Sequence, residues 1–190
     1  MVNLLQVRKA GIPERNLLLV CYALNEPDSS CPECPEIMST SFPITIIVRH
    51  PRESPRKCSV LPLRGRADIL FLSHPVARPP DLAGYVRLAA EGPALSLEDA
   101  GSGLLLLDGS WRWAEVMSRG FIHIPPRSLH GFHTAYPRVA KMGTDPDNGL
   151  ASVEALYLAY RLLGRPTEGL LGHYRWEAEF LRLNGIPSDR

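Results

Sequence analysis

The apolar positions of this chain gather in short continuous runs that polar, proline-rich segments separate. Residues 17–24, 44–48, 67–72 and 104–107 form such runs, and each has the length of a strand buried on both faces. A shorter strand is predicted over residues 121–124. Strands without polar alternation are typical of parallel sheets that helices cover, so the pattern predicts a mainly parallel sheet.

Helices are predicted between and after these strands. The first follows Pro79 and Pro80, covers about residues 81–91 and ends at Gly92. The second begins after Ser110 and stops near Gly120, and two amphipathic helices over about residues 151–163 and 167–183 close the chain. Strands that alternate with helices indicate an α/β domain.

The segment from Leu104 to Glu115 joins the most apolar strand to chemically versatile side chains. Asp108, Ser110 and Trp111 follow four consecutive leucines. Open α/β sheets bind ligands at the carboxyl ends of their strands, so a binding site is predicted here. Two structural alternatives remain open, because Asp108 could only cap the helix and Trp111 could only anchor the core.

Charge is unevenly distributed along the chain. The 190 residues carry a net charge of +1, so the overall charge indicates no partner. Between Arg49 and Arg66, however, six basic residues accompany a single acidic one, Glu53, which gives a local charge of +5. This segment is either a phosphate-binding surface or a solvated loop. The six are Arg49, Arg52, Arg56, Lys57, Arg64 and Arg66.

The first 43 residues are predicted to be an N-terminal extension, which could contribute to the sheet, ahead of a domain over residues 44–190. No apolar run approaches the roughly 20 residues that span a bilayer, and residues 1–16 lack a signal-peptide core, so a cytoplasmic protein is expected. Cys31 and Cys34 form a C-x-x-C pair, which is half of a zinc site. Cys21, His50 or Cys58 could complete it, or the pair could be two free thiols in a loop.

Several stretches, taken together and in order, resemble the DTW-domain proteins and the related small-subunit rRNA aminocarboxypropyltransferases. The core motif of that superfamily is Asp-x-Thr/Ser-Trp with an alanine six residues after the aspartate, which Asp108, Ser110, Trp111 and Ala114 match. Ser110 replaces the threonine of the DTW branch, and residues 127–149 diverge. The other similar stretches are residues 54–59, 72–75 (with His74 inserted), 97–100, 150–156, 174–176 and 180–184.

The resemblance implies a SPOUT-like α/β domain with a C-terminal trefoil knot, which binds S-adenosylmethionine as a monomer. It implies transfer of the 3-amino-3-carboxypropyl group to a uridine-type base in tRNA or rRNA. Trp111 and Ala114 would enclose the S-methyl group, so that the longer arm is transferred. A SPOUT-type RNA methyltransferase and a non-catalytic RNA-binding or ribosome-assembly factor are the alternatives.

Roles for individual residues follow from the same resemblance. Asp108 would act as general base or positioning group, and Glu154 is the second choice, with a helix-dipole role as its alternative. Tyr136 and Arg138 would line the RNA side. The residues expected to bind the cofactor are Ser59, Leu72, Ser73, Leu97, Asp108, Trp111, Ala114, Leu150 and Ser152. Those expected to contact RNA are Arg52, Arg56, Lys57, Arg64, Arg66 and Arg138.

Overall fold

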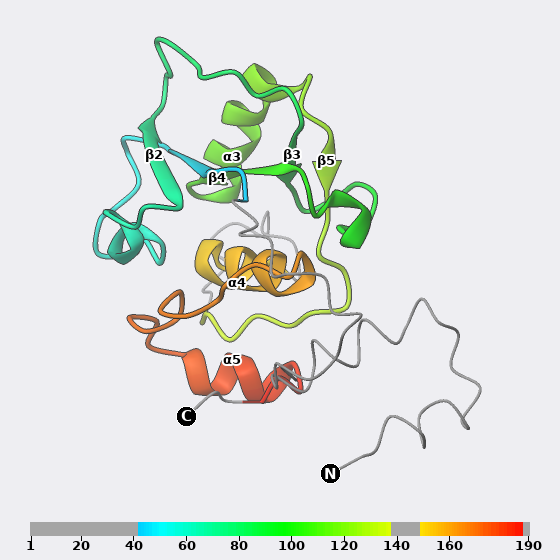
Figure 1. The fold of residues 1–190 in the computed structure, drawn as a ribbon. Helices are drawn as coiled ribbons and strands as arrows, with labels where there is room; N and C mark the ends of the chain where they lie inside the picture. Colours follow the sequence, from blue (N-terminus) through cyan, green and yellow to red (C-terminus); the bar gives the residue numbers. More distant parts are fainter. Residues whose placement is uncertain (1–41, 138–148, 188–190) are drawn as a thin grey trace, which may run out of the picture. The chain divides into compact units, whose positions relative to one another are not determined.

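A computed structural model describes residues 42–137 and 149–187 of the chain. In this part, five parallel strands form one sheet in the order β2-β1-β4-β3-β5 (Figure 1). The strands are β1 (Thr45–Arg49), β2 (Ile69–Ser73), β3 (Tyr85–Leu88), β4 (Gly103–Asp108) and β5 (Pro126–Arg127). The helices are α3 (Trp111–Ser118), α4 (Ser152–Leu162) and α5 (Glu177–Leu183), with short 3-10 helices η2 (Leu61–Leu63), η3 (Leu97–Asp99) and η4 (Arg119–Phe121).

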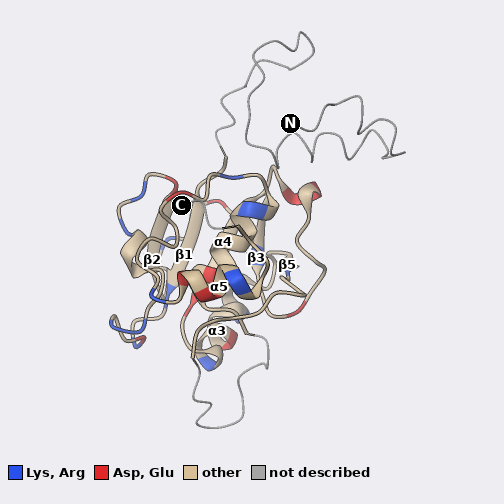
Figure 2. Cartoon of the chain, turned by 90° about the horizontal axis from the view of Figure 1, so that it is seen from below, with Lys and Arg blue, Asp and Glu red and all other residues tan. Residues whose placement is uncertain are grey.

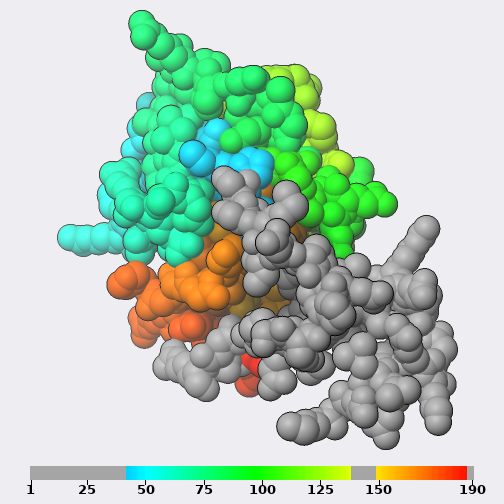
Figure 3. All heavy atoms as spheres, viewed as in Figure 1, coloured from blue at the N-terminus to red at the C-terminus, as the bar shows by residue number. Residues whose placement is uncertain are grey.

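The central strand β4 is buried along its whole length, which explains its run of leucines. Leu104 and Leu106 belong to the larger core cluster, which includes α4 and α5 residues. Leu105 and Leu107 face the other way and pack with Met117 of α3. The sheet therefore lies between α3 on one face and α4 on the other, with α5 beyond α4 (Figure 1), and the α4 and α5 side is seen as orange and red in Figure 3.

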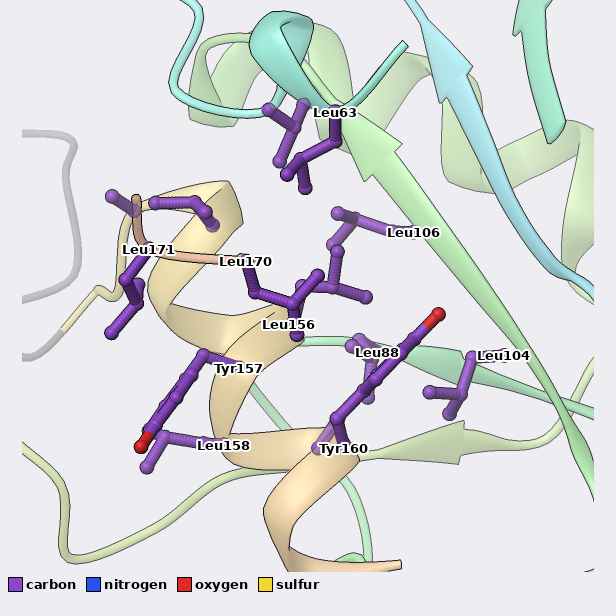
Figure 4. Close-up of a cluster of buried hydrophobic side chains, with 14 of the residues drawn as sticks. Leu63, Leu88, Leu104, Leu106, Leu156, Tyr157, Leu158, Tyr160, Leu170 and Leu171 are labelled. Carbon is purple, nitrogen blue, oxygen red and sulfur yellow. The ribbon is translucent and has the colours of Figure 1, made fainter. Parts of the chain in front are cut away.

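The larger cluster is where most of the apolar area is removed from water. Leu156 and Tyr160 of α4 project toward leucines of β3 and β4, whereas Tyr157 projects from another side of the helix (Figure 4) and packs against Phe180 of α5. Leu170 and Leu171 close this cluster from the segment that follows α4. Among the described residues, no helix has the length and apolarity that a membrane crossing requires.

The register brings three strand ends into one row. Arg49 at the end of β1 lies opposite Ser73 of β2 on one side and Asp108 of β4 on the other. Because all three strands are parallel, the loops that leave them emerge at the same edge of the sheet. The sheet thus places the residues that follow β1, β2 and β4 side by side.

Most of the predicted elements are confirmed. β1, β2, β4, α3 and α4 lie within two residues of the boundaries expected from the apolar pattern. The predicted strand over residues 17–24 lies outside the described residues.

Two predicted elements are wrong and a third is shorter than expected, each for a packing reason. Residues 81–91 are not a helix, because a turn at Gly84 (φ +74°) leads into β3, whose Val86 and Leu88 alternate inward. Residues 121–124 are not a strand, since they form turns that bury Phe121 and Ile124 against α3, and pairing starts only at Pro126. The last helix is shorter than expected, because residues 167–176 form turns, one of them at Gly169 (φ +73°).

The start of β4 has no room for a side chain unless Tyr85 moves. A Cβ on Gly103 would lie 2.5 Å from the ring of Tyr85, which is below any normal carbon contact. Gly103→Ala is therefore expected to lower the free energy of unfolding by about 1–3 kcal/mol in urea titrations. Adding Tyr85→Ala should recover part of this loss, because it empties the same space. Gly101→Ala, which meets no atom within 4 Å, is the control, and an equal loss in both variants would contradict the clash.

Candidate active site

A buried carboxylate occupies the carboxyl end of the central strand. Asp108 is 3% exposed. Its Oδ1 accepts a hydrogen bond from the Ser152 hydroxyl at 2.8 Å, and its Oδ2 accepts one from the Cys58 thiol at 3.0 Å. The Nε of Arg49 lies 3.4 Å from the same Oδ2. Asp108 thus joins four chain segments, and these contacts show a role beyond capping a helix.

Arg49, the cation beside Asp108, is positioned by a second contact. Arg49 donates from Nη2 to the Glu53 carbonyl at 2.6 Å, while its buried Nε has no hydrogen-bond partner. The Glu53 carboxylate in turn accepts the Ser110 amide at 3.0 Å. Because helix N-termini favour negative charge, Glu53 supplies the acid at the start of α3. The loop that contains Glu53 is therefore hydrogen-bonded both to Arg49 and to Ser110 of the motif that follows β4.

Cys58 contributes a neutral donor. Burial is the main cause that raises the pKa of the Cys58 thiol, and the neighbouring Asp108 charge raises it further. A thiol with a raised pKa keeps its proton at neutral pH, which is the form that donates to Asp108. The contact between Cys58 and Asp108 is therefore a structural hydrogen bond.

The N-terminus of α4 meets the same site. Ser152 bonds Asp108, and the next amide, Val153 N, donates to Ser59 Oγ at 3.2 Å. A hydroxyl that accepts one bond still carries a proton to donate. The structure therefore brings together three residues that the sequence assigned to cofactor binding, namely Ser59, Asp108 and Ser152.

The other residues predicted to bind the cofactor differ in their burial and in their position in the fold. Trp111 and Ala114 lie half-buried on successive turns of α3, directly after Asp108. Leu72 is half-buried at the end of β2, and Ser73 beside it is exposed, while Leu150 is half-buried just before α4. Leu97 is different. It lies in η3, ahead of the amino end of β4, and is 55% exposed, so the structure does not bring it to the Asp108 end.

A stack of three rings borders the site and was not predicted. The His50 ring lies 4.0 Å from that of Trp113, centre to centre, at an angle of 9°. The His50 ring also lies 5.8 Å from the His74 ring, at an angle of 27°. Two His-Pro pairs, at residues 50–51 and 74–75, directly follow neighbouring strands, and this repetition is the sequence signal that could have revealed the stack.

The buried histidine predicts a dependence of stability on pH. Burial is the main cause that lowers the pKa of His50, and His74 and Arg52 lower it further. Its contribution to stability is therefore present above the unfolded-state value of about 6.5 and is lost as the pH falls through the folded value. We expect the free energy of unfolding to fall between about pH 7.5 and pH 5.5, and His50→Phe to reduce that fall.

Urea titrations at the two pH values measure this effect. His173→Phe is the matched control, because His173 is exposed. An equal fall in the wild type and in His50→Phe would show that another group is responsible.

Some of the basic residues predicted to contact RNA are exposed, and others contact neighbouring groups of the protein. Arg52, Arg56 and Lys57 are exposed in the loop after β1, and basic residues colour the loops near β1 and β2 in Figure 2. Arg66, in contrast, donates to Asp68 at 2.9 and 3.0 Å and to the Glu168 carbonyl at 2.7 Å, so it has a structural role. The Arg64 guanidinium lies 5.6 Å from the ring centre of Phe71, and Arg138 lies outside the described residues.

Two other features lie away from this site. Within residues 42–137 and 149–187, no group of three or more His, Cys, Asp or Glu residues could hold a metal ion, and Cys31 and Cys34 lie outside this part. A cavity of about 470 Å³ opens at the amino ends of β3 and β4. Its polar lining includes Asp81, Asp99, Ser102, His123 and Arg127, and it contains none of the predicted site residues.

The fold of this chain is similar to that of a known protein of solved structure. No protein-family model matches the chain, and no curated protein sequence matches it. Among solved structures, the chain is similar to the SAM-dependent rRNA:acp-transferase Tsr3 from Vulcanisaeta distributa, with a TM-score of 0.58 and 24% sequence identity. The match covers 76% of this chain and 79% of that chain. The predicted α/β architecture is confirmed, and the described part of the chain, an all-parallel five-stranded sheet with three helices, has the fold of Tsr3.

Proposed function

We propose that the protein transfers the 3-amino-3-carboxypropyl group of S-adenosylmethionine to a uridine-type base in RNA. The observation that carries the proposal is the combination of the Tsr3 fold with the Asp108, Ser110, Trp111 and Ala114 motif at the carboxyl end of the central strand. Fold alone would not support a reaction. The motif adds residues of the required chemistry at the edge of the sheet where α/β proteins bind ligands.

The donor set fits the substrate. Its amino-acid arm carries a carboxylate, for which the Ser59 hydroxyl, which accepts the Val153 amide and keeps its own proton to donate, and the N-terminus of α4 are suited. Arg49 lies beside these donors as a cation, and its Nε is 3.4 Å from Asp108 Oδ2. The indole of Trp111 suits a sulfonium, because aromatic faces attract cations.

S-adenosylmethionine supplies an electrophilic carbon beside a positively charged sulfur, so transfer forms a bond from the base nitrogen to that carbon, breaks the carbon–sulfur bond and releases a thioether. The imide proton of the base leaves to water. Trp111 and Ala114, one helical turn apart, select the carbon by enclosing the methyl group and leaving the longer arm accessible.

Asp108 acts in this proposal as a positioning residue. It is nearly fully buried, and both of its oxygens already accept hydrogen bonds from the protein. A base for the imide proton would need to reach the acceptor directly. Asp108 instead fixes Ser152, Cys58 and Arg49, and through Ser152 it fixes the start of α4.

The acceptor is RNA, and ribosomal RNA is the first choice because Tsr3 acts on rRNA. Arg52, Arg56 and Lys57 would contact phosphates, which adds affinity without sequence selection. The proposal includes the monomeric state and the C-terminal trefoil knot that the sequence resemblance implies.

Two labelled substrates test the reaction. The full chain is incubated with rRNA and tRNA fractions and with S-adenosylmethionine labelled either in the methyl or in the carboxyl carbon. We expect only the carboxyl label to enter RNA, and to enter the rRNA fraction. Methyl label in RNA would identify a methyltransferase, and no label in either fraction would favour a non-catalytic RNA-binding factor. Carboxyl label in tRNA alone would change the substrate and keep the reaction.

A further inference from the structure

The ring stack beside the site has the properties of a surface for nucleobases. Its central ring, His50, is 7% exposed, whereas the two outer rings, Trp113 and His74, are only half-buried. Each ring comes from a different segment, after β1, after β2 and within α3. Part of the Trp113 ring and part of the His74 ring are therefore accessible to other aromatic groups.

Positive charge is held at one end of the stack. The guanidinium carbons of Arg52 and Arg112 each lie 5.6 Å from the ring centre of Trp113, and both residues are exposed. Contacts of this kind hold a guanidinium in place and leave its N–H groups available to other acceptors. Trp113 is thus flanked by two cations suited to phosphate.

The stack is rigidly connected to the candidate active site. The His50 amide donates to the Asp108 carbonyl at 2.9 Å, and the His74 amide donates to the Arg49 carbonyl at 2.9 Å. Gly109, the residue after Asp108, packs against the base of both side chains, because a Cβ there would lie 3.2 Å from Trp113 Cβ and 3.4 Å from His50 Cβ. A group bound on the stack is therefore fixed relative to Asp108.

We propose that Trp113, with Arg52 and Arg112, binds an unpaired nucleotide of the RNA substrate next to the nucleotide that is modified. The base packs against the exposed part of the Trp113 ring, beside the two guanidiniums that contact this ring, and the neighbouring phosphates accept hydrogen bonds from the two arginines. This inference rests on the proposed function for the identity of its ligand. Stacking requires a splayed base, so the surface selects single-stranded RNA over duplex RNA.

Fluorescence anisotropy with the full chain tests the surface in the absence of S-adenosylmethionine. The probes are a short single-stranded oligoribonucleotide and the duplex of the same sequence. Trp113→Leu is expected to weaken binding of the single strand by about tenfold to a hundredfold, while Trp113→Phe retains most of it. Binding of the duplex should change much less in both variants.

The arginines are tested through the salt dependence. Removing two phosphate contacts in Arg52→Ala/Arg112→Ala should reduce the slope of log K against log salt by about 1.4. Arg175→Ala is the matched control, because Arg175 also lies over a tryptophan, Trp176, at 5.7 Å, and it should leave the slope unchanged. Melting temperatures show whether each variant is folded. If Trp113→Leu does not fold, the double arginine variant and Trp113→Phe test whether this surface binds the single strand.

Several outcomes would overturn the proposal. These are wild-type protein that does not bind the single strand, a folded Trp113→Leu that binds it within about twofold of wild type, and poly-glutamate that competes as well as RNA, which would indicate an acidic protein partner. Absence of label transfer by a wild-type protein that binds RNA through Trp113 would instead refute the proposed reaction and leave this surface intact.

Discussion

Asp108→Asn is expected to reduce transfer of the carboxyl label to RNA by about a hundredfold or more, and to lower the free energy of unfolding by about 2–4 kcal/mol. The amide would place N–H groups against the Ser152 hydroxyl or the Cys58 thiol, both of which now donate to the carboxylate. It would also remove the negative charge beside Arg49, whose side chain is only 14% exposed. Label incorporation and urea titrations measure the two effects.

Ser152→Ala is the matched control, because it distinguishes the loss of one hydrogen bond from the loss of the Asp108 charge. Ser152→Ala removes one donor and keeps the charge pair between Asp108 and Arg49, so its stability loss should be about 1 kcal/mol. The assignment of Asp108 as a positioning residue predicts that the residual activity of Asp108→Asn keeps the shape of the wild-type pH profile. Loss of one ionisation from that profile would make Asp108 the base, and wild-type turnover would remove it from the mechanism.

The centre of the fold could be predicted because its signals are local. Four leucines that end in Asp108 indicate a strand buried on both faces with a polar end, and β4 confirms this. β3 could not be predicted in the same way. Its four residues obtain their backbone hydrogen bonds from β4 and β5, which are distant in sequence, and the flanking prolines and glycines are equally typical of a helix.

The site was predictable only in part, for a similar reason. Ser59 and Ser152 were assigned through the resemblance, and the structure brings both to Asp108 or to its neighbour α4. The hydrogen bond from Cys58 depends on how a loop folds back over a strand end, which no local pattern encodes. Leu97 was assigned from its motif alone, and the motif did not indicate at which end of β4 it would lie.

Glu154 shows how far a local interpretation can reach. Its position in the first turn of α4 led to a helix-dipole role, and the Ala151 amide at that terminus does donate to Oε2 at 2.7 Å. However, Glu154 is 0% exposed and accepts three more hydrogen bonds. Thr134 Oγ1 donates to Oε2 at 2.7 Å, while the Ala135 amide and the Tyr174 hydroxyl donate to Oε1, each at 2.8 Å. The carboxylate therefore ties α4 to two segments that are remote in sequence.

Glu154→Gln is accordingly expected to lower the free energy of unfolding by about 2–4 kcal/mol, although the change is nearly isosteric. A carboxylate only accepts, and all four of its partners donate, so an amide nitrogen in either position faces two donors. Tyr174→Phe removes a single donor and should cost about 1 kcal/mol, and Glu179→Gln, on the exposed face of α5, should cost less than about 0.5 kcal/mol. Urea titrations rank the three variants.

Hydrogen exchange can locate the damage. The Ala135 amide donates directly to Glu154, so its protection should fall more in Glu154→Gln than that of amides within β4. That result would place the loss in the segment before residue 138, which reaches α4 through this carboxylate. Uniform loss of protection across the sheet, or a stability equal to that of Tyr174→Phe, would show that the four donors find other acceptors and that Glu154 is not the residue that holds this segment.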